Sequence, residues 1–443
     1  MTTPTRPSPA APPTTGWAPD PASVDRLLPI RPAVSLRDHL ARLGPAPTGT
    51  GSGLPGMLQA AGLRGRGGAG FPTGRKITSV AAAAHRSGLA AVVVANCCEG
   101  DPTSLKDQLL IERSPHLVID GALAAAAAVG ADRVVLAVHE DSAALGTLLA
   151  AVGERPWTGH PVAFIGVPHR YIASEATALV RYVNTGDARP AGKLTPIRDA
   201  GIDGRPTLVC NGETLAHVAL IARFGPAWYA AVGMPAEPGT ALVTLGGAVP
   251  RPGVVEVAHG TTIRAVLGRA GAPPVGWALL GGLAGSWVNL AALAGIGYST
   301  GQLAAAGGTR GVGSIIVLPP GGCLLTETAR ILRHQARAGA RQCGPCMFGL
   351  PAIATDMTDL SRGDRGALDR LHRRLPLIHG RGACGHPDGA VALAASALAA
   401  LTTHHTRHLT HHLLDGTCQP PPPVVPLGPA PPTQHITGWS CRG

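Results

Sequence analysis

Residues 89–98 read LAAVVVANCC, residues 132–140 read DRVVLAVHE, and residues 161–168 read PVAFIGVP. Each run is short, rich in β-branched residues and flanked by helix or turn formers, which is the pattern of a buried strand. Alanine-rich helical stretches separate the runs, and this alternation favours a mostly parallel sheet. We therefore expect an α/β domain over residues 45–235, with ligand sites at the carboxyl ends of its strands.

The pattern of apolar and polar residues changes after residue 235. Residues 236–325 contain two alternating runs, ALVTLGGAV and VVEVA, separated by a Pro-Gly turn and followed by a helix that Thr261 or Thr262 could cap. This order predicts a small β-grasp-like domain. From residue 326 to 418 helical periods take over, which predicts a bundle of about four helices.

Both ends of the chain are rich in proline and small residues. Residues 1–44 are expected to be a disordered or extended N-terminal segment, and residues 419–443, which begin QPPPPVVPLGPAPP, a proline-rich tail. Neither composition offers enough apolar surface to offset the entropy of ordering the chain.

Composition excludes several classes of protein. The chain has 443 residues and a net charge of +11, but no run of five basic residues, which argues against nucleic-acid binding. The longest apolar stretch, residues 121–130, is well short of the about 20 residues that span a bilayer, so no direct membrane span is expected. The N-terminus lacks a secretory pattern, which favours the cytoplasm, or a peripheral place at a membrane through a partner, with the nine cysteines reduced or metal-bound.

The stretch from Gly62 to Lys76 reads GLRGRGGAGFPTGRK, with six glycines in fifteen residues. Such a density suits backbone that approaches a ligand closely, and consecutive N–H groups beside Arg64, Arg66 and Lys76 would form an anion cradle. Only three lysines occur in the chain, and Lys76 is one of them. The loop predicts a phosphate-bearing cofactor, although a glycine-rich surface loop without a ligand is the simpler alternative.

Polar residues follow the predicted strands. Asn96 and Glu99 lie at the end of the strand within residues 89–98, and the stretches YIASEAT (171–177) and VCNGETL (209–215) each place a glutamate beside small residues. Taken alone, each of these last two glutamates is more typical of a carboxylate at a helix N-terminus. Taken with the strand ends, they indicate a ligand crevice.

In combination these motifs resemble a known family. RGRGGAGFPTGRK, NCCEGDPTSLKD, YIASEATAL, DGRPTLVCNGETLAHV, GGAVPRPGVVEV and CGPC occur in the order and approximate spacing of the NADH-binding flavoprotein subunit of respiratory complex I, over about residues 60–400. Relatives of that family also serve hydrogenases and formate dehydrogenases. The resemblance implies an α/β fold: a Rossmann-like domain that binds FMN and NADH, a β-grasp (soluble-ligand-binding) domain, and a helical bundle that holds a 4Fe-4S cluster.

The resemblance also implies roles for single residues. Around FMN it places a glycine-rich group and several polar residues: Gly65, Arg66, Gly67, Gly68, Lys76, Asn96, Tyr171 and Asn211. It places Phe71, Asp101 and Lys193 on the nucleotide, and Glu99 and Glu175 beside the flavin as the catalytic carboxylates. The implied activity is an NADH dehydrogenase that passes electrons through FMN and the cluster to a protein or quinone-linked acceptor.

The implied partners are NADH, or NADPH in its place, and an electron-acceptor protein such as a ferredoxin or another oxidoreductase subunit. Two alternatives remain beside membership of a standard respiratory complex. One is a soluble diaphorase outside complex I. The other is a non-enzymatic scaffold or cluster-only electron relay that has lost nucleotide binding.

Several positions depart from the family pattern. Cys97 and Cys98 stand where the family has Ala and Asp, Ala176 replaces a glutamate, and Cys210 replaces an asparagine. Ile77 and Pro196 stand where the family has aromatic residues, so stacking on the adenine is expected to be weaker. Nucleotide affinity and the preference for NADH over NADPH are the properties these departures would change.

The cysteines indicate a metal site. Cys343 and Cys346 form a CxxC pair and Cys384 follows at a distance, a spacing that fits zinc and an iron-sulfur cluster equally, while the resemblance implies a 4Fe-4S cluster. The family motif begins one cysteine earlier, at the position of Ala340. With three thiolates left, the replacement ligands considered are His386 and Cys418, with His334 a weaker choice.

Overall fold

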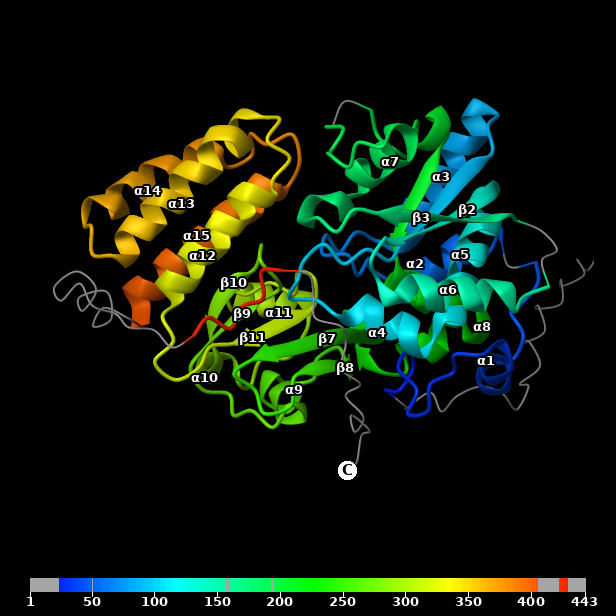
Figure 1. Cartoon of the computed structure of the whole chain (residues 1–443). Helices are drawn as coiled ribbons and strands as arrows, with labels where there is room; N and C mark the ends of the chain where they lie inside the picture. The colour runs from blue at the N-terminus through cyan, green and yellow to red at the C-terminus, as the bar shows by residue number, and fades with distance from the viewer. Residues whose placement is uncertain (1–23, 50, 157–159, 193–194, 405–421, 429–443) are drawn as a thin grey trace, which may run out of the picture.

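The computed structural model describes residues 24–49, 51–156, 160–192, 195–404 and 422–428. Figure 1 shows three parts: an α/β domain, a second sheet with small helices beside it, and a bundle of long helices at the far side of the second sheet. This order along the chain matches the expected fold class, and the parallel sheet confirms the α/β prediction. The domain boundaries given above remain predictions.

The sheet of the first part has four strands: β1 (Ala91–Asn96), β2 (Ala131–His139), β3 (Val162–Val167) and β4 (Thr207–Asn211). Their order is β3-β2-β1-β4, and every neighbouring pair is parallel. The valine-rich β1 is central and buried along almost its whole length, as a continuous apolar run in a two-sided parallel sheet should be. The carboxyl ends of all four strands therefore share one edge.

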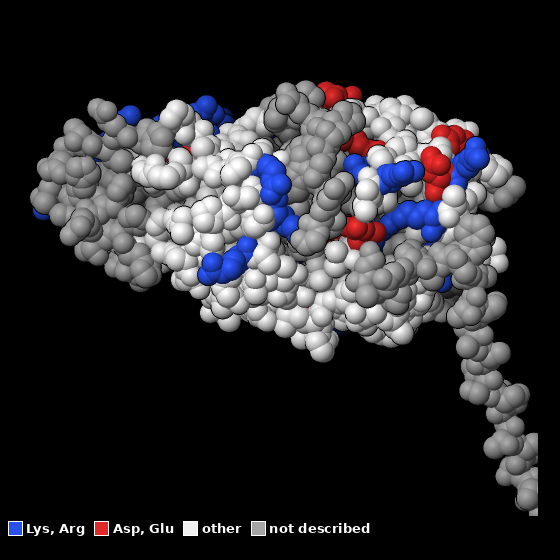
Figure 2. All heavy atoms as spheres, turned by 90° about the horizontal axis from the view of Figure 1, so that it is seen from below, with Lys and Arg blue, Asp and Glu red and all other residues white. Residues whose placement is uncertain are grey.

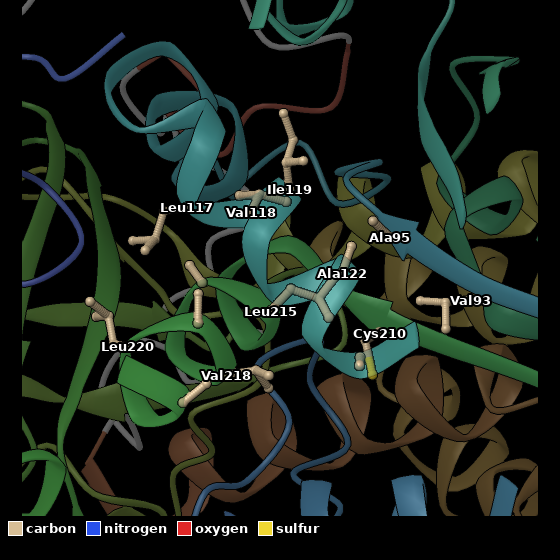
Figure 3. Packing of buried hydrophobic residues seen from close by; sticks show 14 of the residues in the cluster. Val93, Ala95, Leu117, Val118, Ile119, Ala122, Cys210, Leu215, Val218 and Leu220 are labelled. Atoms are coloured by element: carbon tan, nitrogen blue, oxygen red, sulfur yellow. The ribbon is translucent and has the colours of Figure 1, made fainter. Parts of the chain in front are cut away.

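Helices cover this sheet, and α5 with α8 form the tightest contact among them. Leu117, Val118 and Ala122 of α5 meet Leu215 and Val218 of α8 in the core shown in Figure 3. A Cβ added to Gly121 would lie 1.8 Å from the carbonyl oxygen of Leu215, so only glycine permits this approach. The helices of this part are α1 (Leu36–Leu43), α2 (Leu54–Ala60), α3 (Thr73–Ser87), α4 (Lys106–Arg113), α5 (Pro115–Val129), α6 (Ala143–Gly153), α7 (Ala176–Thr185) and α8 (Gly212–Ala230).

The second part is a five-stranded mixed sheet of order β10-β9-β11-β7-β8. Its strands are β7 (Thr240–Gly247), β8 (Gly253–Ala258), β9 (Trp277–Leu280), β10 (Ser286–Asn289) and β11 (Ser314–Val317). Between β8 and β9 lies α9 (Ile263–Arg269), and the Thr262 side chain caps it by accepting a hydrogen bond from the Ala265 N–H. Small elements complete this region: β5 (Gly233–Met234), β6 (Glu237–Pro238), α10 (Leu290–Leu293) and α11 (Thr300–Ala305).

The third part is the helical bundle. It contains α12 (Leu324–Ala338), a π-helical turn η3 (Pro345–Gly349), α13 (Leu350–Ser361), α14 (Gly366–Ile378) and α15 (His386–His404). Leucine and isoleucine side chains at helical spacing fill its core, including Leu332, Ile353 and Leu371. The CxxC pair lies at the entrance to α13, and Cys384 lies just before α15.

Both ends of the chain are more ordered than their composition predicts. Within 1–44, helix α1 forms, and the buried Arg26 guanidinium donates to the backbone carbonyls of Tyr229 (2.9 Å) and Trp228 (3.0 Å) while stacking on the Trp228 ring. Within 419–443, Val425 is buried against the bundle, and the Val424 N–H donates to Glu327. Helix α1 departs from the predicted disordered or extended segment, while the described residues 24–35 and 422–428 lie outside helices and strands and are held by contacts to distant residues that the local sequence does not reveal.

Charged side chains are distributed over the surface. On the face shown in Figure 2, basic side chains lie singly or in small groups, several of them next to acidic side chains. No helix among the described residues combines the length and hydropathy needed to cross a bilayer.

Candidate functional site

The carboxyl edge of the parallel sheet brings two asparagines together. Asn96 ends β1 and Asn211 ends β4, and the two are direct partners in the strand register. The Asn96 side-chain amide donates to the carbonyl of Ser174 (2.8 Å), and its oxygen accepts from the Cys98 N–H (3.2 Å). The hydrogen bond to Ser174 thus holds the YIASEAT segment at the same sheet edge as the two strand ends.

The glycine-rich loop lies against this edge and leads into α3. The Gly65 N–H donates to the Phe71 carbonyl (2.9 Å), which closes the loop at its base. Gly68 and Gly70 have φ values of 105° and 61°, which favour glycine. At the exposed tip, the N–H groups of Gly67, Gly68 and Ala69 form no hydrogen bond with any described residue. Consecutive open N–H groups just before a helix suit an anion such as a phosphate.

Arg66 does not point into this loop. Its guanidinium is buried and donates to the Tyr229 hydroxyl (3.1 Å) and to the Thr240 carbonyl (2.9 Å), while its backbone N–H donates to the Thr214 hydroxyl (2.9 Å). The side chain therefore ties the loop to the second sheet, and only its backbone remains near the cradle. Lys76, at the first turn of α3, donates its ammonium to the Val209 carbonyl on β4.

A buried charge network lies directly behind Asn211. The Lys106 ammonium contacts the carboxylates of Asp107 (2.7 Å) and Glu213 (3.1 Å) and the side-chain oxygen of Asn211 (3.1 Å). Burial acts to lower the pKa of Lys106, but the two carboxylates outweigh it and hold that pKa above its ordinary value. The sequence prediction did not include Lys106 or Asp107 as site residues, although the rarity of lysine in this chain was a signal for the first.

Glu99 lies at the same edge in a half-buried position. Its carboxylate accepts from the Ser104 hydroxyl (2.7 Å) and from the Gln108 N–H (3.0 Å). Burial, with the nearby Asp107 charge, raises the pKa of Glu99 to about 7. A carboxyl group with this pKa can hold or release a proton near neutral pH.

Glu175 and Tyr171 lie between the first part and the bundle. Glu175 caps α7, since its carboxylate accepts from the N–H groups of Thr177 (2.9 Å) and Ala178 (3.0 Å), which is the simpler role considered for it in the sequence. Tyr171 is packed against the His386 ring with 5.3 Å between centroids, and burial raises the pKa of its hydroxyl. The Glu175 carboxylate is also near enough to Cys384 to affect that thiol.

The structure describes two of the three predicted nucleotide contacts, Phe71 and Asp101. Phe71 is 50% exposed at the end of the glycine loop, where a ring could stack on a nucleotide. Asp101 is buried and accepts from the Thr103 hydroxyl (2.7 Å) and from the Leu283 N–H (2.8 Å), so its carboxylate joins the first part to the second sheet. Lys193 lies outside the described residues.

The second candidate site is the corner of the bundle that holds Cys343, Cys346 and Cys384. Burial raises the pKa of the Cys384 thiol, and the Glu175 carboxylate, Cys346 and Cys343 act in the same direction. The Arg341 N–H donates to the Cys346 sulfur (3.2 Å), the kind of contact that tunes iron-sulfur clusters. Within the described ranges, no three His, Cys, Asp or Glu side chains lie close enough to share one metal ion.

His386 and Cys418 were the predicted replacements for the missing thiolate. His386 is the first residue of α15 and is buried beside Cys346. Cys418 lies outside the described residues. The other cysteines, Cys97, Cys98, Cys210 and Cys323, are buried and form no disulfide in the described part of the chain.

Comparison with known proteins gives a family match over each of the two regions. Residues 58–220 match the family described as the Nuo51 FMN-binding domain, which includes the glycine loop and the sheet edge. Residues 326–408 match the NADH-ubiquinone oxidoreductase-F iron-sulfur binding region, which includes the three cysteines.

Full-length relatives agree with these matches. The NADH-quinone oxidoreductase F-subunit 2 of Rhizobium meliloti is 29% identical over 386 residues, covering 82% of this chain and 89% of its own length. The corresponding F-subunit of Rickettsia bellii is 28% identical, with coverages of 75% and 84%. The crystal structure of an NAD+-reducing [NiFe]-hydrogenase superposes with a TM-score of 0.72 at 26% identity over 81% of this chain, which spans 62% of that hydrogenase chain. The chain belongs to the family of NADH-binding flavoprotein subunits of complex I.

Proposed function

We propose that this chain oxidises NADH at a bound FMN and passes the electrons through an iron-sulfur cluster to a separate acceptor protein. The observation that carries the proposal is the cradle of open N–H groups at Gly67, Gly68 and Ala69, seated against Asn211 at the end of β4. An ideal Cβ on Gly67 would lie 3.5 Å from the Asn211 Cβ, so loop and strand end form one concave surface. FMN would supply the redox chemistry, since it accepts two electrons together and releases them singly.

The residues present fit FMN in the following way. Gly67, Gly68 and Ala69 would offer backbone N–H groups to the phosphate, Gly65 closes the base of the loop, and the α3 N-terminus adds a favourable dipole. Lys76 would add positive charge from one side. Arg66 contributes through its backbone, because its guanidinium is directed into the interior.

The polar strand ends would face the ring system. Asn96, Asn211 and Tyr171 would position it, and Glu99 would hold or release a proton near neutral pH. Phe71, exposed beside the loop, would stack on the nucleotide, while Asp101 would act by holding the two parts of the site together. Glu175 would act at the end of α7, between the flavin edge and Cys384.

The acceptor is proposed to be a protein such as a ferredoxin or another oxidoreductase subunit. The hydrogenase that superposes on this chain is described as NAD+-reducing, and the curated relatives are subunits of NADH-quinone oxidoreductases. NADH gives up two electrons together, and the flavin releases them one at a time. A one-electron carrier in the same chain would therefore pass them on to such a partner.

Anaerobic purification followed by a visible spectrum tests the proposal. A yellow-brown protein that NADH bleaches is expected; a protein that stays colourless after reconstitution with FMN would overturn it. Lys76→Ala should weaken FMN binding at least tenfold, about 1.4 kcal/mol, because one charge-assisted contact is lost. Arg75→Ala is the matched control, since Arg75 is adjacent and exposed. Iron-dependent colour without bleaching by NADH would support a cluster-only relay instead.

A further inference from the structure

A cavity of about 480 Å³ lies between the first part of the chain and the end of α12. Its lining comes from three stretches of the described chain: residues 100–102 and 169–172 with 188–189, then residues 334–340, then residues 427–428. Small-molecule pockets typically have volumes of about 300–1,000 Å³. The cavity is therefore large enough for an organic ligand and larger than a single small ion requires.

The charged and titratable side chains that line this cavity are all basic. They are Arg170, Arg189, Arg337, His169 and His334, and no carboxylate belongs to the described lining. Arg170 directly precedes η1 (Tyr171–Ser174) in the first part, whereas Arg337 lies in the last turn of α12 in the bundle. Cations from two walls around one hollow create a positive potential that favours a bound anion.

Two of these basic side chains already have acidic partners. Arg189 donates to both carboxylate oxygens of Asp187 (2.8 and 2.7 Å), and the His169 ring lies 3.1 Å from the Asp141 carboxylate. The side chains of Arg170 and Arg337 form no hydrogen bond or ion pair with any described residue. These two guanidinium groups are thus the ones available to a ligand in the cavity.

The rest of the lining adds little charge. Burial, with the charges of His386 and Arg337, lowers the pKa of His334, so this ring is mostly neutral at pH 7. Ile172 and Leu427 give the lining an apolar side. The cavity therefore combines two uncompensated cations with apolar surface, which suits an anionic group attached to an apolar body.

We propose that this cavity binds a small organic phosphate, with Arg170 and Arg337 holding the phosphate group from the two walls. A guanidinium presents its N–H donors in a planar fork that matches phosphate oxygens, and two such groups can bind separate oxygens of one phosphate. The body of the ligand lies against Ile172 and Leu427. No residue of the glycine loop lines this cavity, so the site is separate from the cradle at the sheet edge and does not depend on the proposed function.

Calorimetric titration of the full-length protein, reconstituted with FMN and freed of excess FMN, tests the proposal. Phenyl phosphate should bind more tightly than inorganic phosphate, and its affinity should fall as the salt concentration rises. Arg170→Ala and Arg337→Ala should each weaken this binding at least tenfold, because each removes a charge-assisted hydrogen bond. Malonate, a dianion without a phosphate group, should bind more weakly than phenyl phosphate.

Arg333→Ala is the matched control. Arg333 is exposed on the same helix, α12, but does not line the cavity, so its removal should leave the affinity unchanged. The proposal is overturned if phenyl phosphate does not bind, if Arg170→Ala and Arg337→Ala bind it as the wild-type chain does, if Arg333→Ala weakens binding equally, or if malonate binds as tightly.

FMN content and bleaching by NADH, measured on the same samples, report separately on folding and on the proposed function. Both should match the wild-type chain in Arg170→Ala and Arg337→Ala, because neither arginine belongs to the flavin edge. Phenyl phosphate binding without bleaching by NADH would contradict the proposed function alone and support the phosphate site.

Discussion

The flavin edge and the cluster corner solve the problem of buried polar groups differently. At the flavin edge, Lys106, Asp107, Glu213 and Asn211 pair with one another within the protein. At the cluster corner, His386 Nε2 lies 2.8 Å from the Gln335 carbonyl oxygen, and its Nδ1 has no partner among the described residues. The fold thus pairs the buried charges of the first region, whereas it leaves a buried ring nitrogen of the second region without a partner.

Removing the central cation should break the flavin edge. Lys106→Met leaves Asp107 buried without its cationic partner and Glu213 with the more distant Arg66 guanidinium (3.9 Å), so the free energy of unfolding should fall by about 3–5 kcal/mol. Lys76→Met, which loses one hydrogen bond to a carbonyl, should cost about 1 kcal/mol. Chemical denaturation of the FMN-free protein measures the free energy of unfolding of both variants. Equal decreases in the two would contradict a buried charge network that is stable without the cofactor.

The packing behind the flavin edge is tested at Gly121. Gly121→Ala places a methyl group against the Leu215 carbonyl, so α8 must move and stability should fall by about 2–3 kcal/mol. Gly146→Ala on α6 is the control, because its Cβ would meet nothing within 4 Å and the change should stabilise by about 0.5–1 kcal/mol. Thermal unfolding distinguishes the two; a neutral Gly121→Ala would mean that this helix contact does not constrain the edge.

Metal removal should affect the two regions unequally. After iron is stripped from the reconstituted protein, amide exchange in η3 and at the start of α15 should accelerate at least tenfold, about 1.4 kcal/mol of local stability, since metal binding contributes folding energy there. Exchange in β1 and β4 should stay unchanged. Mass spectrometry of deuterium uptake measures both regions. Equal acceleration of exchange in the two regions would contradict the prediction.

The smallest expected effect is a pH dependence from Glu99. Its pKa is about 7 in the folded chain against an ordinary value of 4.5, so between these values the folded state binds the proton more strongly than the unfolded state. The stabilisation is fully present below pH 4.5 and is lost as the pH rises through 7. Between pH 5 and 8 the wild-type protein should lose about 1 kcal/mol more than Glu99→Gln, after allowance for solvent screening. Parallel pH profiles of the two would refute this assignment.

Local sequence predicted the main elements because their signals are short-range. The valine run of β1, the positive-φ glycines of the loop and the Thr262 cap each depend on a few neighbouring residues. The buried Arg26 and Val425 escaped prediction because their partners lie far along the chain. The side-chain directions of Arg66 and Asp101 escaped for the same reason, since both turn toward the second sheet.

The amino-acid sequence was sufficient to establish the order of strands and helices, the glycine cradle, and the absence of one cluster thiolate at Ala340. Periodicity, glycine content and cysteine spacing carry that information directly. The folded chain was needed to show that Lys106 is neutralised behind Asn211 and that His386 Nε2 donates to Gln335 while Nδ1 lacks a partner among the described residues. Hydrogen bonding and burial between residues separated by dozens of positions depend on packing, which no local pattern encodes.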